Sequence, residues 1–249
     1  MPGLARDGAP AGLARWPSTT PAPPTALSLS IVMPVLNETV VIEGALEALT
    51  TLRRRGAEVI VADGGSTDAS VELAAPLADR IVHTSPGRAR QMNAGAAAAR
   101  GDVLLFLHAD TRLPAHADQL VLEAIAAGSI WGRFDVSIAG RPRMLRVVAA
   151  FMNARSRWSG VATGDQGMFV HRPAFERLGG FADQPLMEDV ELSSRLRRIG
   201  RPACLRARVT TSGRRWEHRG VWRTIFLMWR LRWRYWRGES RQTLARAYR

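Results

Sequence analysis

The sequence predicts an α/β protein whose central, mostly parallel sheet is flanked by helices. Residues 27–35, 57–63 and 103–107 are continuous apolar runs, as expected of strands that are buried on both faces. Segments with helical periodicity separate these runs, so strands and helices alternate along the chain. With 249 residues, of which 46% are hydrophobic, the chain can bury a large core.

The first half of the chain contains four predicted strands and the helices between them. The strands span 27–35, 57–63, 79–83 and 103–107, and helices follow over 38–54, after the turn at 64–70, and over 90–100. Val41, Leu46 and Leu49 share one face of the first helix. Ser66 or Asp68 is expected to cap the start of the second. Gly101 is expected to cap the end of the third.

The second half has a mixed pattern. It predicts helices over 115–127 and 142–157, a strand over 130–138, a glycine-flanked segment at 164–170 and a short helix after Pro173. A further helix over 187–200 has acidic residues in its first turn, arginines in its last turn and Gly200 as its end. The second half therefore departs from the regular alternation of the first.

Charge and composition restrict the class of protein. All 35 basic residues are arginines, and 17 of them lie in residues 195–249, where only two residues are acidic. The rest of the chain is nearly neutral, so a uniform nucleic-acid-binding surface is not indicated. Cys204 is the single cysteine, which excludes an internal disulfide and favours a reducing, cytoplasmic location. Residues 1–27 resemble a disordered tail rather than a secretory signal, and no apolar run is long enough to span a bilayer.

Polar residues follow the predicted strands where each one ends. Asn37 and Glu38 follow the first strand, Asp63 ends the second, and His108 and Asp110 follow the fourth. Ligands of parallel α/β sheets bind outside the carboxyl ends of the strands. We therefore expect these residues to lie close together at a binding site.

The chemistry of these residues suits a nucleotide diphosphate. The chain lacks both the dinucleotide fingerprint and the P-loop. Asp63 could instead accept hydrogen bonds from a base or ribose, and Asp110 could hold a diphosphate through Mg²⁺ or Mn²⁺. The alternative is local structure, with Asp63 and Asp68 in turns, Asp110 in a capped loop and His108 a satisfied polar residue. Both interpretations stay open at this point.

Six segments resemble, in order, the motifs of family 2 glycosyltransferases of the GT-A fold. They are PVLNE (34–38), VADGGSTD (61–68), GRARQMNAG (87–95), LLFLHAD (104–110), GDQGMF (164–169) and PLMEDVELSSRLRRIG (185–200). The resemblance covers about 30–240. RARQMNAGA, FLHADTRLP and RRWEHRGVWRT are similar to a bacterial subgroup named for arsenosugar biosynthesis, also known as the radical-SAM/selenodomain-associated transferase.

The resemblance implies donor-site roles for one set of residues. Pro34, Asn37 and Glu38 would line the nucleotide pocket, Asp63 would bind the base or ribose, and Arg88, Arg90 and Asn93 would approach the diphosphate and donor sugar. Asp110 would be the metal-binding Asp of the D-x-D motif. His108 replaces the first Asp of that motif, and its ring nitrogen would favour Mn²⁺ or softer ions.

The resemblance implies further roles around the acceptor. Asp189, with Glu188, would supply the general base of an inverting reaction. Asp165, Gln166, Arg215 and Trp216 would lie on the acceptor side. Without the resemblance, the two acids could equally be first-turn residues that the helix dipole favours.

The C-terminal segment, 214–238, predicts a basic amphipathic helical extension. Trp222, Trp229, Trp233 and Trp236 share one helical face, and arginines occupy the others. Such a helix binds the headgroup region of anionic membranes. Alternatively, the tryptophan face packs on the catalytic domain and the arginines are solvated. The domain prediction is thus a tail at 1–27, a GT-A domain at 28–213 and this extension at 214–249.

The predicted function is an inverting glycosyltransferase that moves a sugar from a nucleotide-diphosphate sugar to an acceptor hydroxyl. The acceptor would be a small molecule of the arsenosugar type, or a lipid such as a carotenoid acid or polyprenyl phosphate at the inner face of the membrane. A different class, a membrane- or nucleic-acid-binding module, is the non-enzymatic alternative. The clustered acids argue against nucleic acid because they would repel a polyanion.

Overall fold

The computed structural model describes residues 26–240, 243–244 and 247. Most of the predicted N-terminal tail lies outside these residues. Leu27, at the end of that predicted tail, already packs partly buried against the hydrophobic core. The described domain therefore includes Leu27.

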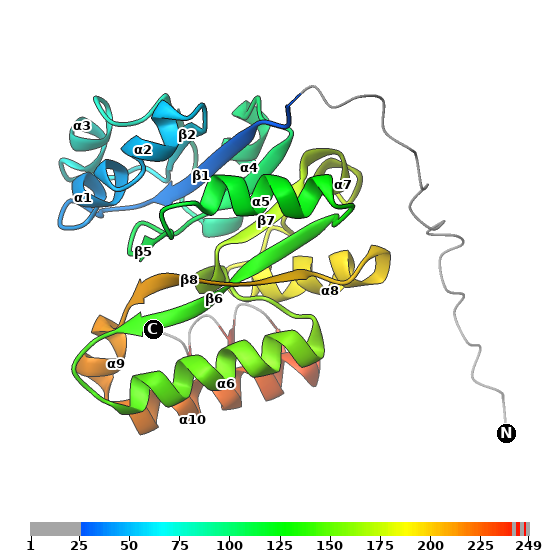
Figure 1. The fold of residues 1–249 in the computed structure, drawn as a ribbon. Coiled ribbons are helices and arrows are strands. Elements are labelled where there is room, and N and C mark those ends of the chain that lie inside the picture. Colours follow the sequence, from blue (N-terminus) through cyan, green and yellow to red (C-terminus); the bar gives the residue numbers. More distant parts are fainter. Residues whose placement is uncertain (1–25, 241–242, 245–246, 248–249) are drawn as a thin grey trace, which may run out of the picture.

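The described residues form one eight-stranded sheet in the order β3-β2-β1-β4-β7-β6-β8-β5 (Figure 1). The strands are β1 Leu29–Val35, β2 Glu58–Asp63, β3 Arg80–His83, β4 Val103–Phe106, β5 Thr111–Arg112, β6 Trp131–Ala139, β7 Met168–His171 and β8 Ala203–Ser212. The pairs β1–β2, β2–β3, β1–β4 and β6–β8 are parallel. β7 is antiparallel to both β4 and β6, and β5 is antiparallel to β8. The prediction of a mostly parallel sheet is confirmed.

Helices cover both faces of this sheet. They are α1 Ile42–Glu47, α2 Thr50–Arg54, α3 Ser70–Ala74, α4 Arg88–Ala98, α5 Ala117–Ala126, α6 Met144–Ser159, α7 Arg172–Arg177, α8 Glu188–Ile199, α9 Arg214–Arg219 and α10 Val221–Trp236, with a 3₁₀ turn, η1, at Gly164–Gln166. Helices α1, α2, α5 and α6 contribute to one buried cluster. Helices α4, α7 and α8 contribute to the other.

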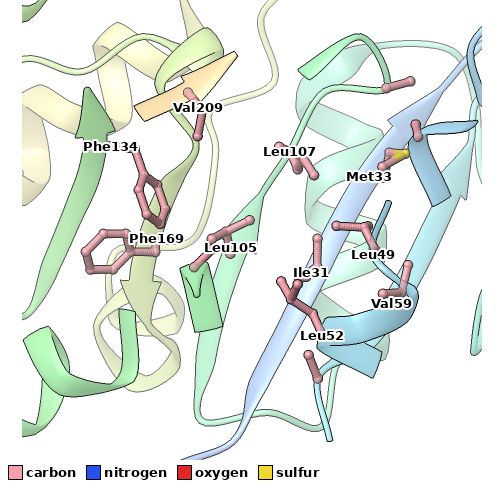
Figure 2. Close-up of a cluster of buried hydrophobic side chains, with 14 of the residues drawn as sticks. Ile31, Met33, Leu49, Leu52, Val59, Leu105, Leu107, Phe134, Phe169 and Val209 are labelled. Carbon is pink, nitrogen blue, oxygen red and sulfur yellow. The ribbon is translucent and has the colours of Figure 1, made fainter. Parts of the chain in front are cut away.

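The central strands are buried on both faces, as their apolar runs predict. Ile31 and Met33 of β1 enter one cluster, shown in Figure 2, whereas Val32 between them enters the other. Leu105 and Leu104 of β4 divide in the same way. Successive side chains of a strand point to opposite faces. A strand in this position has room for apolar side chains on both sides, so the charged residues that follow it lie beyond its end.

Three local predictions were wrong. The helix expected over 38–54 is two helices, because the chain turns between Glu47 and Thr50. Neither Ser66 nor Asp68 caps α3, whose first residue is Ser70. Asp68 instead accepts a hydrogen bond from the Ser70 N–H at 3.0 Å.

Gly101 does not cap α4, which ends at Ala98. Its role is close packing, because a Cβ at this position would lie 2.6 Å from the backbone nitrogen of Ser30. The requirement comes from β1, which precedes Gly101 by about 70 residues in the sequence. The residues around Gly101 in the sequence give no indication of this close contact with β1.

The longest strand, β8, has no counterpart among the predicted elements. It pairs along β6 from Gly132 opposite Ala203 to Ala139 opposite Ser212, with an irregularity between Phe134 and Asp135. Glycine is required at 132, since a Cβ there would lie 2.5 Å from the carbonyl oxygen of Ala203. β8 thereby joins the C-terminal part of the chain to the same sheet.

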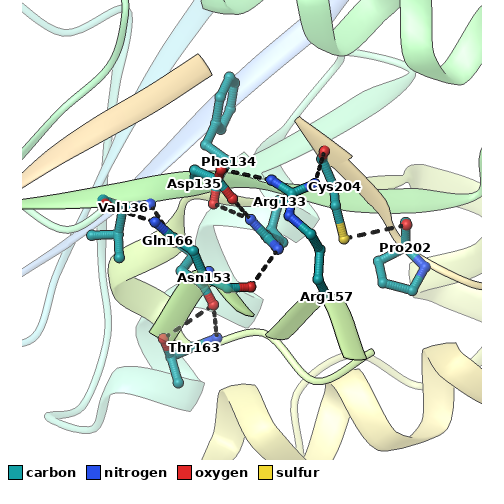
Figure 3. Close-up of polar contacts among 10 residues, drawn as sticks. All are labelled: Arg133, Phe134, Asp135, Val136, Asn153, Arg157, Thr163, Gln166, Pro202 and Cys204. Carbon is teal, nitrogen blue, oxygen red and sulfur yellow. Dashed lines mark hydrogen bonds and ion pairs between the residues drawn. The ribbon is translucent and has the colours of Figure 1, made fainter. Parts of the chain in front are cut away.

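A buried polar cluster anchors α6 to β6 (Figure 3). Arg133 is wholly buried, pairs with Asp135 and donates to the Asn153 carbonyl at 3.3 Å. Arg157 reaches the other oxygen of Asp135 at 2.6 Å. The Asn153 side chain accepts from the Val136 N–H at 2.8 Å and donates to the Val136 carbonyl at 3.0 Å. These contacts fix both the position and the rotation of α6.

The C-terminal helices lie against the domain with the tryptophans outward. Thr224 and Leu231 are buried, while the exposed fractions of the four α10 tryptophans are 58–78%. The alternative in which the tryptophan face packs on the domain is therefore wrong. Among the helices within the described residues, none has the length and apolar character needed to cross a membrane.

We expect Asn153→Ala to lower the free energy of unfolding by about 2–4 kcal/mol, because it leaves the buried N–H and carbonyl of Val136 unpaired. Denaturant titration followed by circular dichroism measures this loss. Ala154→Ser, at the exposed neighbouring position of α6, should change stability by no more than about 0.5 kcal/mol. A loss of under about 1 kcal/mol for Asn153→Ala would show that the two contacts do not hold α6.

Candidate functional site

The candidate site lies at the carboxyl ends of β1, β2 and β4, where the starts of α4 and α8 and the η1 turn meet them. A small pocket at its centre is lined by Met92, Phe106, His108, Gly164, Met168, Phe181, Glu188 and Asp189. Four of these side chains are apolar, and the ring centroids of Phe106 and Phe181 are 4.8 Å apart. The pocket thus combines two acids and an imidazole with an apolar wall.

Glu188 and Asp189 begin helix α8, directly after Met187, which has a left-handed φ of 65°. The Gly164 N–H donates to Asp189 Oδ2 at 2.6 Å, and the Val190 N–H donates to Oδ1 at 2.7 Å. Burial and the neighbouring charge of Glu188 raise the pKa of Asp189 to about 6, against these hydrogen bonds. A carboxyl group tuned in this way can accept a proton near neutral pH.

Arg88 is the cation that faces this acid pair. It stands at the first position of α4, and its Nη1 lies 3.5 Å from Glu188 Oε1. Burial disfavours its charge, but Glu188, Asp165, Asp189 and Asp110 outweigh burial and keep the pKa of Arg88 above its ordinary value. The predicted donor-side arginine is therefore surrounded by the predicted acids.

His108 lies between the end of β4 and the η1 turn. Its Nδ1 is 3.5 Å from Asp165 Oδ1, and its side chain is only 15% exposed. The ring packs directly on Gly164, where an added Cβ would lie 2.5 Å from His108 Cε1. The structure thus brings His108, Asp165 and Asp189 around one glycine, a position that has no room for a side chain.

Asp110 and Glu38 form a second acidic group at the same edge. The pKa of Glu38 is raised above its ordinary value by burial and by the charge of Asp110. The charges of Arg214, Arg88 and His108 oppose this rise. The negative potential shared by these two carboxylates would attract a cation. Within the described residues, no group of three or more His, Cys, Asp or Glu side chains could hold a metal by itself. Asp110, exposed at the loop, suits the kind of site in which a hard cation binds one or two carboxylates and the substrate's phosphates.

The residues predicted to line the nucleotide pocket form a tightly bonded loop pair. Asn37 has a left-handed φ of 56° and donates its N–H to Ser66 Oγ at 3.0 Å. Its Oδ1 accepts from the Thr67 N–H at 2.9 Å. Pro34 is half-buried in β1 beside Ala62 of β2. The loop after β1 is thus held by the loop after β2.

Two aspartates stabilise the second of these loops. Asp68 accepts hydrogen bonds from Ser70 and Thr39, which lower its pKa to about 2. Asp63 is 2% exposed and accepts from the backbone of Gly65 and Ser66. Burial raises the pKa of Asp63, but its hydrogen bonds, including one with His83, outweigh burial and lower it. In this conformation both carboxylates accept hydrogen bonds from the turn. This is the local structural role that the sequence left as an alternative to ligand binding.

Arg90 and Asn93 contact a neighbouring loop. Arg90 forms a two-pronged ion pair with Asp183, with Nη2 2.9 Å from Oδ2. The Asn93 amide donates to the Phe181 carbonyl at 2.8 Å and accepts from the Phe181 N–H at 2.9 Å. Both residues hold the segment that leads into Glu188 and Asp189. The structure therefore places them beside the site as supports for α8.

The predicted acceptor-side residues separate into different environments. Asp165 lies in the site beside His108. Gln166 is wholly buried and accepts from the Thr163 N–H at 3.2 Å, which closes the η1 turn. Trp216 packs half-buried against the core. The side chain of Arg215 lies outside the described part of the structure.

Two further arginines act on the acids of the site, and only one of them, Arg155, was missed from the sequence. Burial lowers the pKa of Arg155 of α6 below its ordinary value; the charge of Asp189 opposes this change and the charge of Arg133 adds to it. Arg214, at the start of α9, acts on Glu38. Arg214 begins the segment RRWEHRGVWRT, whose resemblance to the family already pointed to the active site. Arg155 offered no such signal, because its helix has an ordinary amphipathic pattern.

Known proteins resemble the chain in sequence. A sequence model of the family described as Glycosyl transferase family 2 matches residues 30–179. The probable glycosyltransferase YdaM of Bacillus subtilis strain 168 is 27% identical in an alignment of 238 residues that covers 85% of this chain and 55% of that protein. The chain therefore spans little more than half the length of this relative.

Solved structures resemble the fold. Mannosyltransferase PcManGT from Pyrobaculum calidifontis, in complex with GDP-Man and Mn²⁺, matches with a TM-score of 0.58 at 21% identity, over 78% of this chain and 59% of its own. Glucosyl-3-phosphoglycerate synthase from Mycobacterium tuberculosis, in complex with Mn²⁺, UDP and glucosyl-3-phosphoglycerate, matches with a TM-score of 0.56 at 20% identity, over 74% and 71%. These likenesses confirm the GT-A type of fold. Because the family model covers more than half of the 249 residues, the chain belongs to glycosyl transferase family 2.

Proposed function

We propose that this protein transfers a sugar from a nucleotide-diphosphate sugar to an acceptor hydroxyl with inversion at the anomeric carbon. The observation that carries the proposal is the position of Asp189. It is a partly desolvated carboxylate with a raised pKa, and it lies beside the edge of the sheet where Glu38, Asp110 and Arg88 gather. Family membership supports the reaction type, and the nucleotide-bound PcManGT and synthase structures support the class of donor.

Asp189 acts as the general base in this proposal. The N–H groups of Gly164 and Val190 hold its two oxygens, so the carboxylate is oriented before the acceptor arrives. It takes the proton of the acceptor hydroxyl as that oxygen attacks the anomeric carbon. His108 and Asp165 border the same space. Arg155 lies near enough to Asp189 to stabilise it once the carboxylate is ionised.

In this proposal the diphosphate leaving group binds between the start of α4 and the end of β4. Arg88 is the nearest cation of the site to the acid pair, and Arg214 contributes positive charge near Glu38. These arginines would stabilise the charge that develops on the departing diphosphate. Asp110, with Glu38 and His108 beside it, would hold a divalent cation, Mg²⁺ or Mn²⁺. Such a cation would supply further positive charge to the diphosphate.

The acceptor is a separate part of the proposal. The resemblance to the arsenosugar subgroup favours a small polar molecule, and the C-terminal extension favours a lipid. A small polar acceptor would supply the hydroxyl whose proton the base takes, whereas a carotenoid acid or polyprenyl phosphate would attack through an already ionised carboxylate or phosphate oxygen. A vesicle-bound lipid acceptor and a dissolved one are distinguished by assaying transfer with each class in turn.

We expect one nucleoside diphosphate among UDP, GDP, CDP and dTDP to raise the Tm by about 5 °C when present at about 100 times its Kd. The rise should need Mn²⁺ or Mg²⁺ and should disappear in Asp110→Ala, which removes the predicted metal ligand. Thermal-shift measurements on the full chain provide the test. Glu123→Ala, an exposed acid on α5, is the matched control and should respond as the wild type does.

A shift that EDTA leaves unchanged would contradict the cation at Asp110 and assign the diphosphate to the arginines alone. The absence of a shift with every nucleotide would contradict the donor class. Neither result depends on knowing the acceptor.

We expect Asp189→Asn to lower kcat by about 10²–10⁴-fold, because an amide cannot take the hydroxyl proton. The Kd of the nucleotide should stay within about twofold, since this residue lies on the acceptor side of the proposed site. Kinetics on the donor and acceptor, together with the thermal shift, measure both quantities. Near wild-type turnover in this variant would exclude Asp189 as the base.

We expect kcat/KM to rise with pH through an apparent pKa of about 6 in the free enzyme, because only ionised Asp189 can accept a proton. Glu188→Gln removes the like charge that contributes to the raised pKa, so the rising limb should move to lower pH while the maximal rate survives. A pH profile of both proteins measures the shift. If Glu188→Gln instead abolished turnover at every pH, the base would be Glu188.

A further inference from the structure

Large apolar side chains are exposed together on two helices, α6 and α10. Of the ten large hydrophobic side chains that are exposed in the described part of the chain, eight lie on this pair, with exposed fractions of 58–86%. We define these eight as the aromatic face: Val147, Phe151 and Trp158 on α6, and Trp222, Phe226, Trp229, Trp233 and Trp236 on α10. Such a concentration marks a surface that binds something apolar.

The two helices form one continuous surface. Figure 1 shows α6 and α10 running side by side, and the ring centroids of Phe151 and Trp229 are 6.4 Å apart. On α10 the five aromatic residues recur at steps of four and three, so they share one side of the helix. Thr224 and Leu231 on another side are buried against the domain. The aromatic face is thus held away from the protein's own core.

Arginines border the aromatic face. Arg223, Arg230, Arg234 and Arg237 recur at steps of seven, four and three and form a parallel stripe on α10. Three of them, with Trp233 and Glu239, line a hollow, and the Arg237 guanidinium lies 4.6 Å from the centre of the Trp233 ring. Tryptophan rings suit the interface between water and lipid, and a neighbouring arginine stripe suits anionic phosphates.

We propose that the aromatic face is a docking surface for an anionic lipid bilayer, with α6 and α10 lying in the plane of the headgroups. Charge selects this occupant over a second copy of the chain. Residues 221–239, which form α10 and its end, contain five arginines and one acid, Glu239, which pairs with Arg234, so pairing two such faces would bring like charges together. Anionic headgroups would instead neutralise the arginine stripe while the tryptophans enter the interface.

The proposal gives α6 two roles. Its outward side carries Phe151 and Trp158, and the same helix carries the partly buried Arg155, on which the charge of Asp189 acts. Docking would therefore hold the acceptor side of the proposed site close to the lipid surface. The docking itself is independent of the proposed glycosyl transfer, because it can be measured without donor or acceptor.

The test is co-sedimentation of the full-length protein with vesicles of phosphatidylcholine alone or with about 30% phosphatidylglycerol. We expect binding to the anionic vesicles at about 0.1 M salt, weakening at about 0.5 M as screening increases. Trp229→Ser combined with Trp233→Ser and Trp236→Ser should reduce the partition coefficient at least about tenfold. Leu36→Ser combined with Val40→Ser removes two exposed apolar side chains elsewhere and should leave binding unchanged.

A second measurement is made on the wild type and does not depend on the folding of a variant. Brominated lipids should quench the tryptophan fluorescence, since five of the eight tryptophans lie on the aromatic face. Absence of vesicle binding at low salt, or binding without quenching, would overturn the proposal. So would a dimer, seen by light scattering without lipid, that the triple serine variant abolishes, since the face would then join two copies.

Discussion

The burial of β1 and β4 on both faces is the constraint from which the arrangement of the site follows. Their side chains alternate between two separate apolar clusters, and every side chain of the two strands except Pro34 is buried. An ionised side chain within such a strand would be desolvated without a partner. Within these two strands no side chain is charged, and Glu38, His108 and Asp110 lie beyond their carboxyl ends.

The second half of the chain completes that edge from the other side. The η1 turn and the start of α8 bring Asp165, Glu188 and Asp189 to the end of β4, beside an apolar wall that includes Phe106 and Phe181. Burial raises the pKa of Asp189, and Arg88 keeps the acid pair from being an uncompensated charge. Two other residues expected at the diphosphate, Arg90 and Asn93, hold the loop before α8. Arg90 and Asn93 therefore hold the loop before α8 through defined side-chain contacts, just as Arg88 contacts the acid pair at the centre of the site.

Helix α6 connects the core, the site and the outer surface. Asn153 and its neighbours on β6 set its rotation. Because that rotation is set, Arg155 lies near Asp189 while Phe151 and Trp158 are exposed. A change of one residue in the register of α6 would move all three side chains together. The stability of the domain and the proposed membrane contact therefore depend on the same buried polar cluster.

The sequence by itself predicted the strands and helices that depend on the pattern of neighbouring residues. The apolar runs predict β1, β2 and β4, and the acid-to-arginine gradient predicts α8, because strand and helix periods are properties of neighbouring residues. The sequence also places Glu38, His108 and Asp110 at one edge, since parallel strands share their carboxyl ends. The motif resemblance added Asp189, Glu188 and Arg88, which the structure brings together.

Tertiary structure decided what depends on distant partners. It paired Arg90 with Asp183, brought Arg155 to Asp189, added β8 to the sheet and left Gly101 no room for a side chain beside Ser30. Periodicity shows that four tryptophans share a side of α10, but only the packing of Thr224 and Leu231 shows that this side faces outward. A repeating pattern defines the faces of a helix, whereas the surface that each face meets is set by residues far away in the sequence.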